Sequence, residues 1–295
     1  MIGRRLFLGH SLLFLSGCAL THATGHSPNS PLPRPSKLRF TVTDLSSLDV
    51  LQKDFGDFRQ ALADVLQMPV EFFPVENYSA AAPAFLANEL DFALAGPSEY
   101  LLLRARADAA PIVGITRPNY VSMIMTRVDG EIDQLSELNN KKIAMRTEGS
   151  TSGHIVPMKM LLDAGVAPDA YEVQMLNLEG FEALRSGQVD AWADSYSRYL
   201  EYVKEPGLEG TEIRVIATSE NLPPDILVAN PNLGPEFLAE LRKQILQHQG
   251  VLMSALLASE ANQKYKHSEL VSVEDIDYQT LRDSYHAIGQ GSTIE

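Results

Sequence analysis

The sequence predicts an α/β protein with two lobes and a ligand cleft between them, and three observations support this fold class. The chain has 295 residues, about two domains at roughly 100–200 residues each. Short β-rich runs alternate with helical stripes, as in mostly parallel sheets that carry helices on both faces. This alternation runs through two successive cycles. In open α/β sheets, ligands bind in clefts at the carboxyl ends of the strands.

The first cycle is expected to form most of one lobe. Phe58, Leu62 and Leu66 follow helical spacing and predict a helix over 57–67. A second helix is expected over 79–90. The strands expected in this cycle are 38–43, 70–75, 91–95, 112–115 and 121–125.

The second cycle is expected to form the other lobe. Gly165 ends a helix predicted over 153–164, and Pro157 within it indicates that the regular helix starts late or kinks. The other expected elements are a helical turn at 134–138, strands at 142–145, 173–176 and 189–193, a helix at 180–186, a returning strand at 213–217 and helices within 235–257. Lobe 1 is therefore assigned to 38–126 and 217–295, and lobe 2 to 127–216.

Composition argues against several classes of protein. Hydrophobic residues at 45% and charged residues at 21% are typical of a globular chain. Lys and Arg total 24 against 38 Asp and Glu, and this net charge of -14 argues against a nucleic-acid-binding face. A single Cys excludes a disulfide framework and a cysteine-rich zinc site. The His residues lack metal-ligand spacing, so no metal or other cofactor is expected.

The N-terminus resembles an export signal. Arg4 and Arg5 precede an apolar run over 6–15, about half the length that spans a bilayer. The same arginines resemble a twin-arginine signal, so that route and plain Sec export both stay open. Residues 1–17 are therefore assigned to a signal peptide.

The chain's only Cys lies at the end of this segment. Leu15-Ser16-Gly17-Cys18 resembles a bacterial lipoprotein cleavage box, which predicts lipidation of Cys18; the alternative is an ordinary signal peptide with an incidental Cys. Residues 18–37, rich in Pro, Ser and Thr, predict a flexible tether. The mature protein is expected in the periplasm or at the outer face of the cytoplasmic membrane, attached by the lipid alone.

The expected chemistry centres on a polar loop between a strand and a helix. Ser150, Thr151 and Ser152 place three hydroxyls beside the free N–H groups of a helix N-terminus, where the helix dipole favours an anion. An ordinary N-cap needs one hydroxyl. Three predict a site that orients a small oxyanion without a permanent Lys or Arg clamp.

The same loop does not match the catalytic motifs that it superficially suggests. A nucleophile elbow needs Ser at the centre of G-x-S-x-G, where this chain has Thr151. A phosphate-binding P-loop needs a Lys before its hydroxyl residue, and none stands there. No catalytic activity is therefore predicted.

Gly149-Ser150-Thr151-Ser152-Gly153-His154, followed by Pro157, resembles the signature of the phosphonate/phosphite/phosphate-binding proteins of ABC importers, the PhnD-like group. The resemblance extends over the mature body, through segments at 76–78, 91–97, 117–122, 189–194 and 222–225. It implies a type II periplasmic-binding-protein fold that closes about its ligand by a hinge. It also implies an ABC permease and ATPase as partners, and we expect a monomer.

The resemblance implies roles for particular side chains. The three loop hydroxyls would donate to ligand oxygens, as would His154, which titrates near neutrality. Tyr78 and Tyr120 would each offer a hydroxyl and a ring wall. The implied ligand-binding set is Ser150, Thr151, Ser152, His154, Tyr78, Tyr120 and Asp194.

Asp194 is expected to decide which oxyanion binds. A carboxylate repels an oxyanion unless the ligand carries a proton to share. Phosphate-type groups titrate with a second pKa of about 6, so a protonated oxygen can donate to Asp194, whereas sulfate cannot. Ser98 and Asp225 are weaker candidates, and the late segment that holds Asp225 resembles the family's Pro-Asp turn.

Several conspicuous residues are interpreted as structural. Trp192 lies on a predicted strand and is expected in the core. The tyrosines over 196–202 recur at three-residue spacing and indicate a half-buried helical face. Arg104 and Arg106 are expected at a solvated helix end.

These observations predict the substrate-binding lipoprotein of an ABC importer, which captures phosphite, phosphate or a short alkylphosphonate and delivers it to the permease. The alternative is a ligand-sensing binding protein that signals to a membrane receptor kinase. No acidic cluster suited to an amine is visible in the sequence, which argues against an aminoalkylphosphonate.

Overall fold

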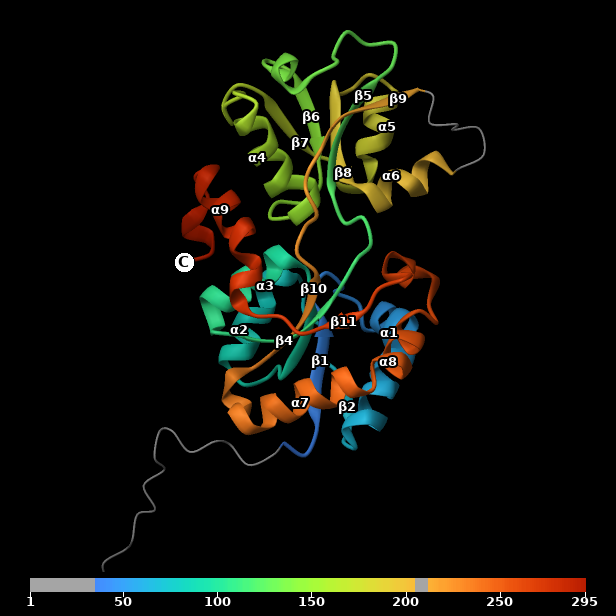
Figure 1. Cartoon of the computed structure of the whole chain (residues 1–295), viewed down its shortest axis with the longest axis vertical. Coiled ribbons are helices and arrows are strands. Elements are labelled where there is room, and N and C mark those ends of the chain that lie inside the picture. The colour runs from blue at the N-terminus through green and yellow to red at the C-terminus, as the bar shows by residue number, and fades with distance from the viewer. Residues whose placement is uncertain (1–34, 205–211) are drawn as a thin grey trace, which may run out of the picture. The chain divides into compact units, whose positions relative to one another are not determined.

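The computed structural model describes residues 35–204 and 212–295, all within the unit 31–295 (Figure 1). The predicted signal peptide over 1–17, Cys18 and the tether as far as residue 34 lie outside the described residues. Within the described ranges, no helix is both long and apolar enough to cross a bilayer.

The first sheet of the described chain has six strands in the order β11-β4-β10-β3-β1-β2. Their bounds are β1 Leu38–Val42, β2 Val70–Phe72, β3 Phe92–Ala95, β4 Ala110–Ile115, β10 Asp225–Ala229 and β11 Leu270–Val271. β1 pairs in parallel with β2 and β3, whereas β10 runs antiparallel to both β3 and β4. The sheet is therefore mixed, not mostly parallel, because the chain inserts β10 only after it returns from the second sheet.

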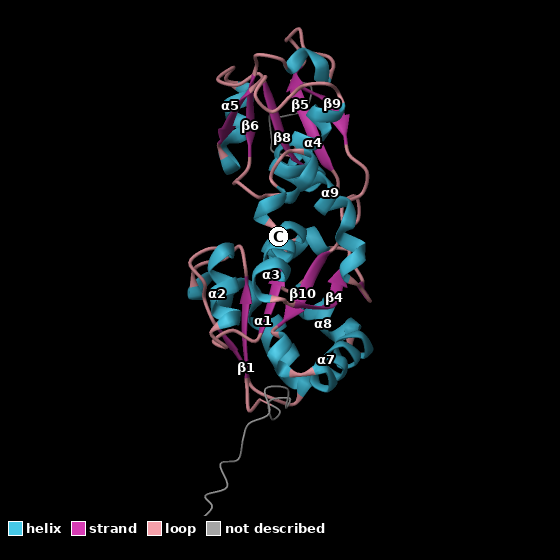
Figure 2. Cartoon of the chain, turned by 90° about the vertical axis from the view of Figure 1, so that its left-hand side faces the viewer, coloured by secondary structure: helices cyan, strands magenta, loops and turns pink. Residues whose placement is uncertain are grey.

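Helices cover both faces of this sheet (Figure 2). Their bounds are α1 Leu48–Leu66, α2 Ala81–Leu86, α3 Pro97–Ala107, α7 Pro235–Gln247 and α8 Gln249–Leu256. Side chains of a strand alternate between faces, so Phe92 and Leu94 of β3 pack in the core under α1, α7 and α8. Ala93 and Ala95 face the core under α2 and α3. The small alanines let α3 approach the sheet closely.

The second sheet has five strands among the described residues, in the order β7-β6-β8-β5-β9. Their bounds are β5 Ser122–Arg127, β6 Lys142–Met145, β7 Glu172–Met175, β8 Ala191–Ser195 and β9 Ile213–Thr218. This sheet is also mixed: β6 is parallel to β7 and β8, and β5 is antiparallel to β8 and β9.

The helices of the second sheet are α4 Val156–Asp163, α5 Gly180–Arg185 and α6 Tyr196–Val203. Trp192 is only 1% exposed, so its predicted place in the core is confirmed. Phe181 stacks on Tyr202 with ring centroids 4.5 Å apart, and Trp192 meets both rings edge-on. This aromatic cluster fixes α6 against the sheet.

In the described part of the chain, residues 116–121 lead from β4 to β5 and residues 219–224 lead back from β9 to β10 (Figure 1). The lobe limits predicted from the sequence, 38–126 with 217–295 and 127–216, stay a prediction. The strand pairing places all of β5 and β9 in the second sheet.

The C-terminal segment also contacts both halves of the molecule. α9 (Gln279–Ala287) follows β11 of the first sheet and packs against α3 and α4 (Figures 1 and 2). Tyr278 and Tyr100 lie with ring centroids 4.6 Å apart where this segment meets α3. The strands β10 and β11 were not predicted from the sequence.

Candidate ligand-binding site

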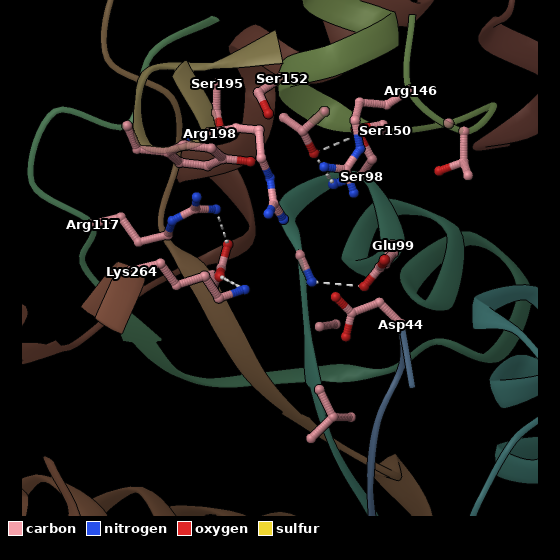
Figure 3. Close-up of a pocket in the computed structure, with 18 of the residues that line it drawn as sticks. Asp44, Ser98, Glu99, Arg117, Arg146, Ser150, Ser152, Ser195, Arg198 and Lys264 are labelled. Atoms are coloured by element: carbon pink, nitrogen blue, oxygen red, sulfur yellow. Dashed lines mark hydrogen bonds and ion pairs between the residues drawn. The ribbon is translucent and has the colours of Figure 1, made fainter. Parts of the chain in front are cut away.

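A cavity of about 920 Å³ is lined by residues from both halves of the molecule (Figure 3). The first half contributes the start of α3, including Ser98 and Glu99. The second half contributes the three-hydroxyl loop and the end of β8, including Asp194. The predicted loop and the predicted acid therefore face one space.

The three hydroxyl residues of the loop all line the cavity. The loop leaves β6 and enters η3 (Thr151–Ile155), a π-helical turn that continues into α4 at Val156. The expected late start of the regular helix is confirmed. The Ser150 carbonyl accepts from the N–H groups of His154 at 3.0 Å and Ile155 at 2.9 Å. The first N–H groups of such a turn have no acceptor within it, so they suit an anion.

Thr151 is engaged with the opposite half of the molecule. Ser98 donates its N–H to Thr151 Oγ1 at 3.1 Å, and the Thr151 hydroxyl donates to Ser98 Oγ at 2.9 Å. Ser98 follows Pro97 at the N-terminus of α3, so two helix N-termini meet beside the cavity. The structure thus brings the weaker candidate Ser98 to the site.

His154 supports the loop from behind. Its ring is buried, and Nδ1 accepts a hydrogen bond from the Gly149 N–H at 3.0 Å. Burial lowers the pKa of His154, which favours the neutral ring that can accept this bond. His154 is not among the cavity-lining residues of the described chain. A ligand contact by this residue would have to come from Nε2.

The two predicted tyrosines differ in what the structure shows of them. Tyr120 lines the cavity and is 7% exposed; burial raises its pKa, so its hydroxyl stays protonated and can donate. The Arg117 guanidinium lies 3.6 Å from its ring centroid. Tyr78 begins η1 (Tyr78–Ala80), and its neighbour Ser79 lines the cavity.

Asp194 lines the cavity and has one carboxylate oxygen without a hydrogen bond among the described residues. Its Oδ1 accepts from the Ser195 N–H at 2.7 Å. Its Oδ2 is buried without a hydrogen-bond partner among the described residues, and Arg146 Nη1 lies 3.7 Å away. Burial raises the pKa of Asp194, although the Arg146 cation acts against this shift. The carboxylate is therefore a strong acceptor for a proton carried by a ligand.

Asp225 is the first residue of β10 and not part of a turn, which corrects the interpretation of 222–225. It accepts from the Tyr265 hydroxyl at 2.7 Å and pairs with Arg117 and Lys264, each at 3.4 Å. Burial alone would raise the pKa of Asp225, but the two cations outweigh burial and hold it below its usual range. Its acceptor capacity is largely taken by the protein.

Charged side chains on the cavity wall are the main feature that sequence reasoning missed. The lining cations are Arg106, Arg117, Arg146, Arg198 and Lys264, and none of them was predicted to bind the ligand. Lining carboxylates are also present: Asp44, Glu99, Glu148, Asp194, Glu201, Asp225 and Glu260. These residues come from separate elements, and no local motif marks them.

Glu99 shows how one such acid is held. Its carboxylate accepts from the Gly96 N–H at 2.8 Å and from the Thr43 hydroxyl, so it satisfies a free N–H at the start of α3. Burial, with Asp44 nearby, raises the pKa of Glu99 to about 7. Figure 3 shows Glu99 and Asp44 together on the wall.

Two α/β halves that line one polar cavity are typical of periplasmic binding proteins. The model of the family described as "ABC transporter, phosphonate, periplasmic substrate-binding protein" matches residues 40–278, and the chain belongs to this family. The resemblance seen in the sequence is thereby confirmed.

Individual relatives are more distant. The phosphate-import protein PhnD of Mycolicibacterium smegmatis is 24% identical over 200 residues, which are 62% of this chain and 62% of that protein. The chain thus spans about three fifths of that relative's length.

Two solved structures show the same fold. PhnD1 from Prochlorococcus marinus in complex with methylphosphonate has a TM-score of 0.68 at 20% identity, covering 87% of this chain and 99% of that one. XAC2383 from Xanthomonas citri bound to ATP has a TM-score of 0.71 at 17% identity, covering 88% and 98%. The predicted type II periplasmic-binding-protein fold is confirmed.

Proposed function

We propose that the protein is the substrate-binding component of an ABC importer and captures phosphite, phosphate or a short alkylphosphonate. The observation that carries this proposal is the placement of the Ser150–Ser152 loop and Asp194 on one cavity wall. Loop hydroxyls and free N–H groups supply donors for the anionic oxygens. The buried acceptor of Asp194 supplies the partner for a P–OH group. The name of the Mycolicibacterium relative and the bound ligand of the Prochlorococcus one agree with this chemistry.

The combination of donors and one strong acceptor favours phosphorus over sulfur oxyanions. Near neutrality the phosphate dianion still carries a P–OH, and phosphite or an alkylphosphonate, with a second pKa of about 6, can regain one at little cost, whereas sulfate carries none. A ligand without that proton would leave Asp194 facing a negative oxygen. Unpaired charge in a buried site is costly, so sulfate is rejected.

Capture is proposed to occur by closure of the two lobes about the ligand, followed by delivery to a membrane permease driven by an ATPase. A lipid on Cys18 and the tether over 18–37 would keep the binding protein at the outer face of the cytoplasmic membrane. Labelling with radioactive palmitate, compared with a Cys18→Ala variant, tests this anchor.

The ligand is tested by isothermal titration of the mature chain with phosphite, phosphate, methylphosphonate and sulfate. At 100 times its dissociation constant, a ligand raises the free energy of unfolding by about 2.7 kcal/mol. Combined replacement of Ser150 and Ser152 by Ala is expected to abolish this stabilisation. Ser136→Ala, on the exposed turn Leu135–Leu138, is the matched control. Tight sulfate binding, or no binding of any phosphorus oxyanion, would contradict the proposal.

A further inference from the structure

We propose that Arg146 binds the ligand together with Asp194, the guanidinium taking a deprotonated oxygen and the carboxylate taking the P–OH hydrogen. This inference rests on the proposed function and deepens it: the pair selects an oxyanion that is protonated once in the bound complex. The proposal adds a charged donor to a site in which the loop supplies only neutral donors, its hydroxyls and backbone N–H groups.

The geometry of the pair leaves both partners incomplete. Arg146 Nη1 and Asp194 Oδ2 lie 3.7 Å apart, close enough for an ion pair but too far for a good hydrogen bond. Arg146 Nε and Asp194 Oδ2 are both buried without a hydrogen-bond partner in the described chain. Buried polar groups are normally satisfied because leaving them unpaired is costly. A ligand with one P–O⁻ and one P–OH would satisfy both.

The loop sequence holds Arg146 in place. Arg146 directly follows β6, and its N–H donates to the Gly153 carbonyl at 3.0 Å. A Cβ on Gly153 would lie 2.1 Å from Arg146 Cγ and 2.7 Å from Arg146 Cβ. The second glycine of the loop therefore leaves space for the arginine stem. Figure 3 shows Arg146 beside Ser150 at the cavity.

Three other cations of the wall, Arg117, Arg198 and Lys264, already have protein partners. Arg117 and Lys264 share Asp225, and Arg117 also stacks on Tyr120. Arg198 pairs with Glu201 at 2.5 Å. Arg146 has a longer contact, 3.7 Å to Asp194, and retains donor capacity for a ligand.

Charge balance sets the expected pH dependence. Arg146 and Asp194 cancel, and the other charges that act on Asp194 are Arg198 and Glu201 of α6, which oppose one another. Methylphosphonate loses its only P–OH at the second ionisation, whereas the phosphate dianion keeps one. Above that ionisation, the complex must take up about one proton for each methylphosphonate bound. Phosphate binding takes up much less.

The experiment titrates the wild-type protein with methylphosphonate and phosphate from pH 5.5 to pH 8.5. Buffers of different ionisation enthalpy report the proton uptake directly. Asp194→Asn is expected to remove the proton uptake and to reduce the ratio of methylphosphonate affinity to sulfate affinity. Arg146→Gln is expected to weaken both ligands by about 10- to 100-fold, the usual size of a charged hydrogen bond, while the proton uptake remains.

Two further variants make the result decisive. Arg185→Gln removes an arginine from an exposed ion pair of the same lobe and is expected to change neither ligand's affinity. Arg146→Lys keeps the charge and is expected to recover part of the loss even if Arg146→Gln folds poorly. Wild-type affinity in Arg146→Gln, or a Lys variant no better than the Gln variant, overturns the inference and leaves the proposed function standing. A wild-type protein that binds no phosphorus oxyanion refutes the proposed function itself.

Discussion

Ser98 and Thr151 exchange hydrogen bonds directly beside the cavity, joining the N-terminus of α3 to the first residue of η3. Both residues are buried, so water competes little for these groups. Elsewhere on the cavity wall, Arg117 of the connection between the sheets donates to Ser197 of α6 at 3.4 Å. The two halves therefore touch through polar contacts, which the proposed closure about a ligand would keep or exchange.

Ser98→Ala tests the first of these contacts. The variant leaves the Thr151 hydroxyl without its acceptor, and the free energy of unfolding should fall by about 1 kcal/mol. The average separation of the lobes, measured by small-angle X-ray scattering, should increase. Ser136→Ala on the exposed turn is the control. An unchanged scattering curve together with unchanged stability would show that the contact does not hold the lobes.

Asp225→Asn tests the buried charge network. Arg117 and Lys264 would lose the carboxylate that neutralises them, and breaking such a pair costs roughly 3 kcal/mol. Lys37→Ala, which removes an exposed pair with Glu71, should cost less than about 1 kcal/mol. Urea unfolding near pH 7 measures both variants. Equal losses of unfolding free energy in the two variants would mean that burial does not strengthen the ion pairs of Asp225.

The same network predicts a response to acid. Because the folded pKa of Asp225 is depressed, its contribution to stability is present above the unfolded value of about 3.9. That contribution is lost as pH falls through the folded pKa. The wild-type protein should therefore lose more stability below about pH 4 than Asp225→Asn does. An equal loss of stability in acid in both proteins would contradict a depressed pKa of Asp225 in the folded state.

His154→Gln tests the support behind the loop. Burial depresses the folded pKa of His154, so the unfolded state takes up the proton first as pH falls below about 6.5. Stability from this residue is present above that value and declines toward the folded pKa. Urea unfolding at pH 7.5 and pH 5 should show a smaller acid loss in the variant. His286→Gln, at a half-exposed site on α9, should keep the full loss.

Gly153→Ala tests the space that the loop reserves for Arg146. The new Cβ meets the arginine stem and not its flexible end, so the loop or the side chain must move. Methylphosphonate affinity should fall by at least about 10-fold, matching loss of a charged hydrogen bond. Gly250→Ala has open space within a helix and should be neutral or slightly stabilising. Calorimetric titration with thermal unfolding separates lost affinity from lost fold.

Local patterns allowed much of the fold to be predicted. β3, β6 and the helix after the loop were predicted from the spacing of apolar residues within short stretches of the sequence. α1 begins at Leu48 and not at residue 57, because Ser47 caps an exposed first turn and the buried stripe already starts with Leu51 and Phe55. The mixed sheets were missed because strand direction depends on where β10 inserts between β3 and β4.

The sequence by itself determined the alternating strands and helices, the loop with its three alcohols, and the family to which the chain belongs. Each of these features depends on residues that are close together in the sequence. Only the tertiary structure decided that Ser98 meets Thr151, that His154 turns its Nδ1 to Gly149, and which cations reach the cavity. The physical reason is that contacts between groups far apart along the chain depend on packing and on cancellation of buried charge, which no local spacing records.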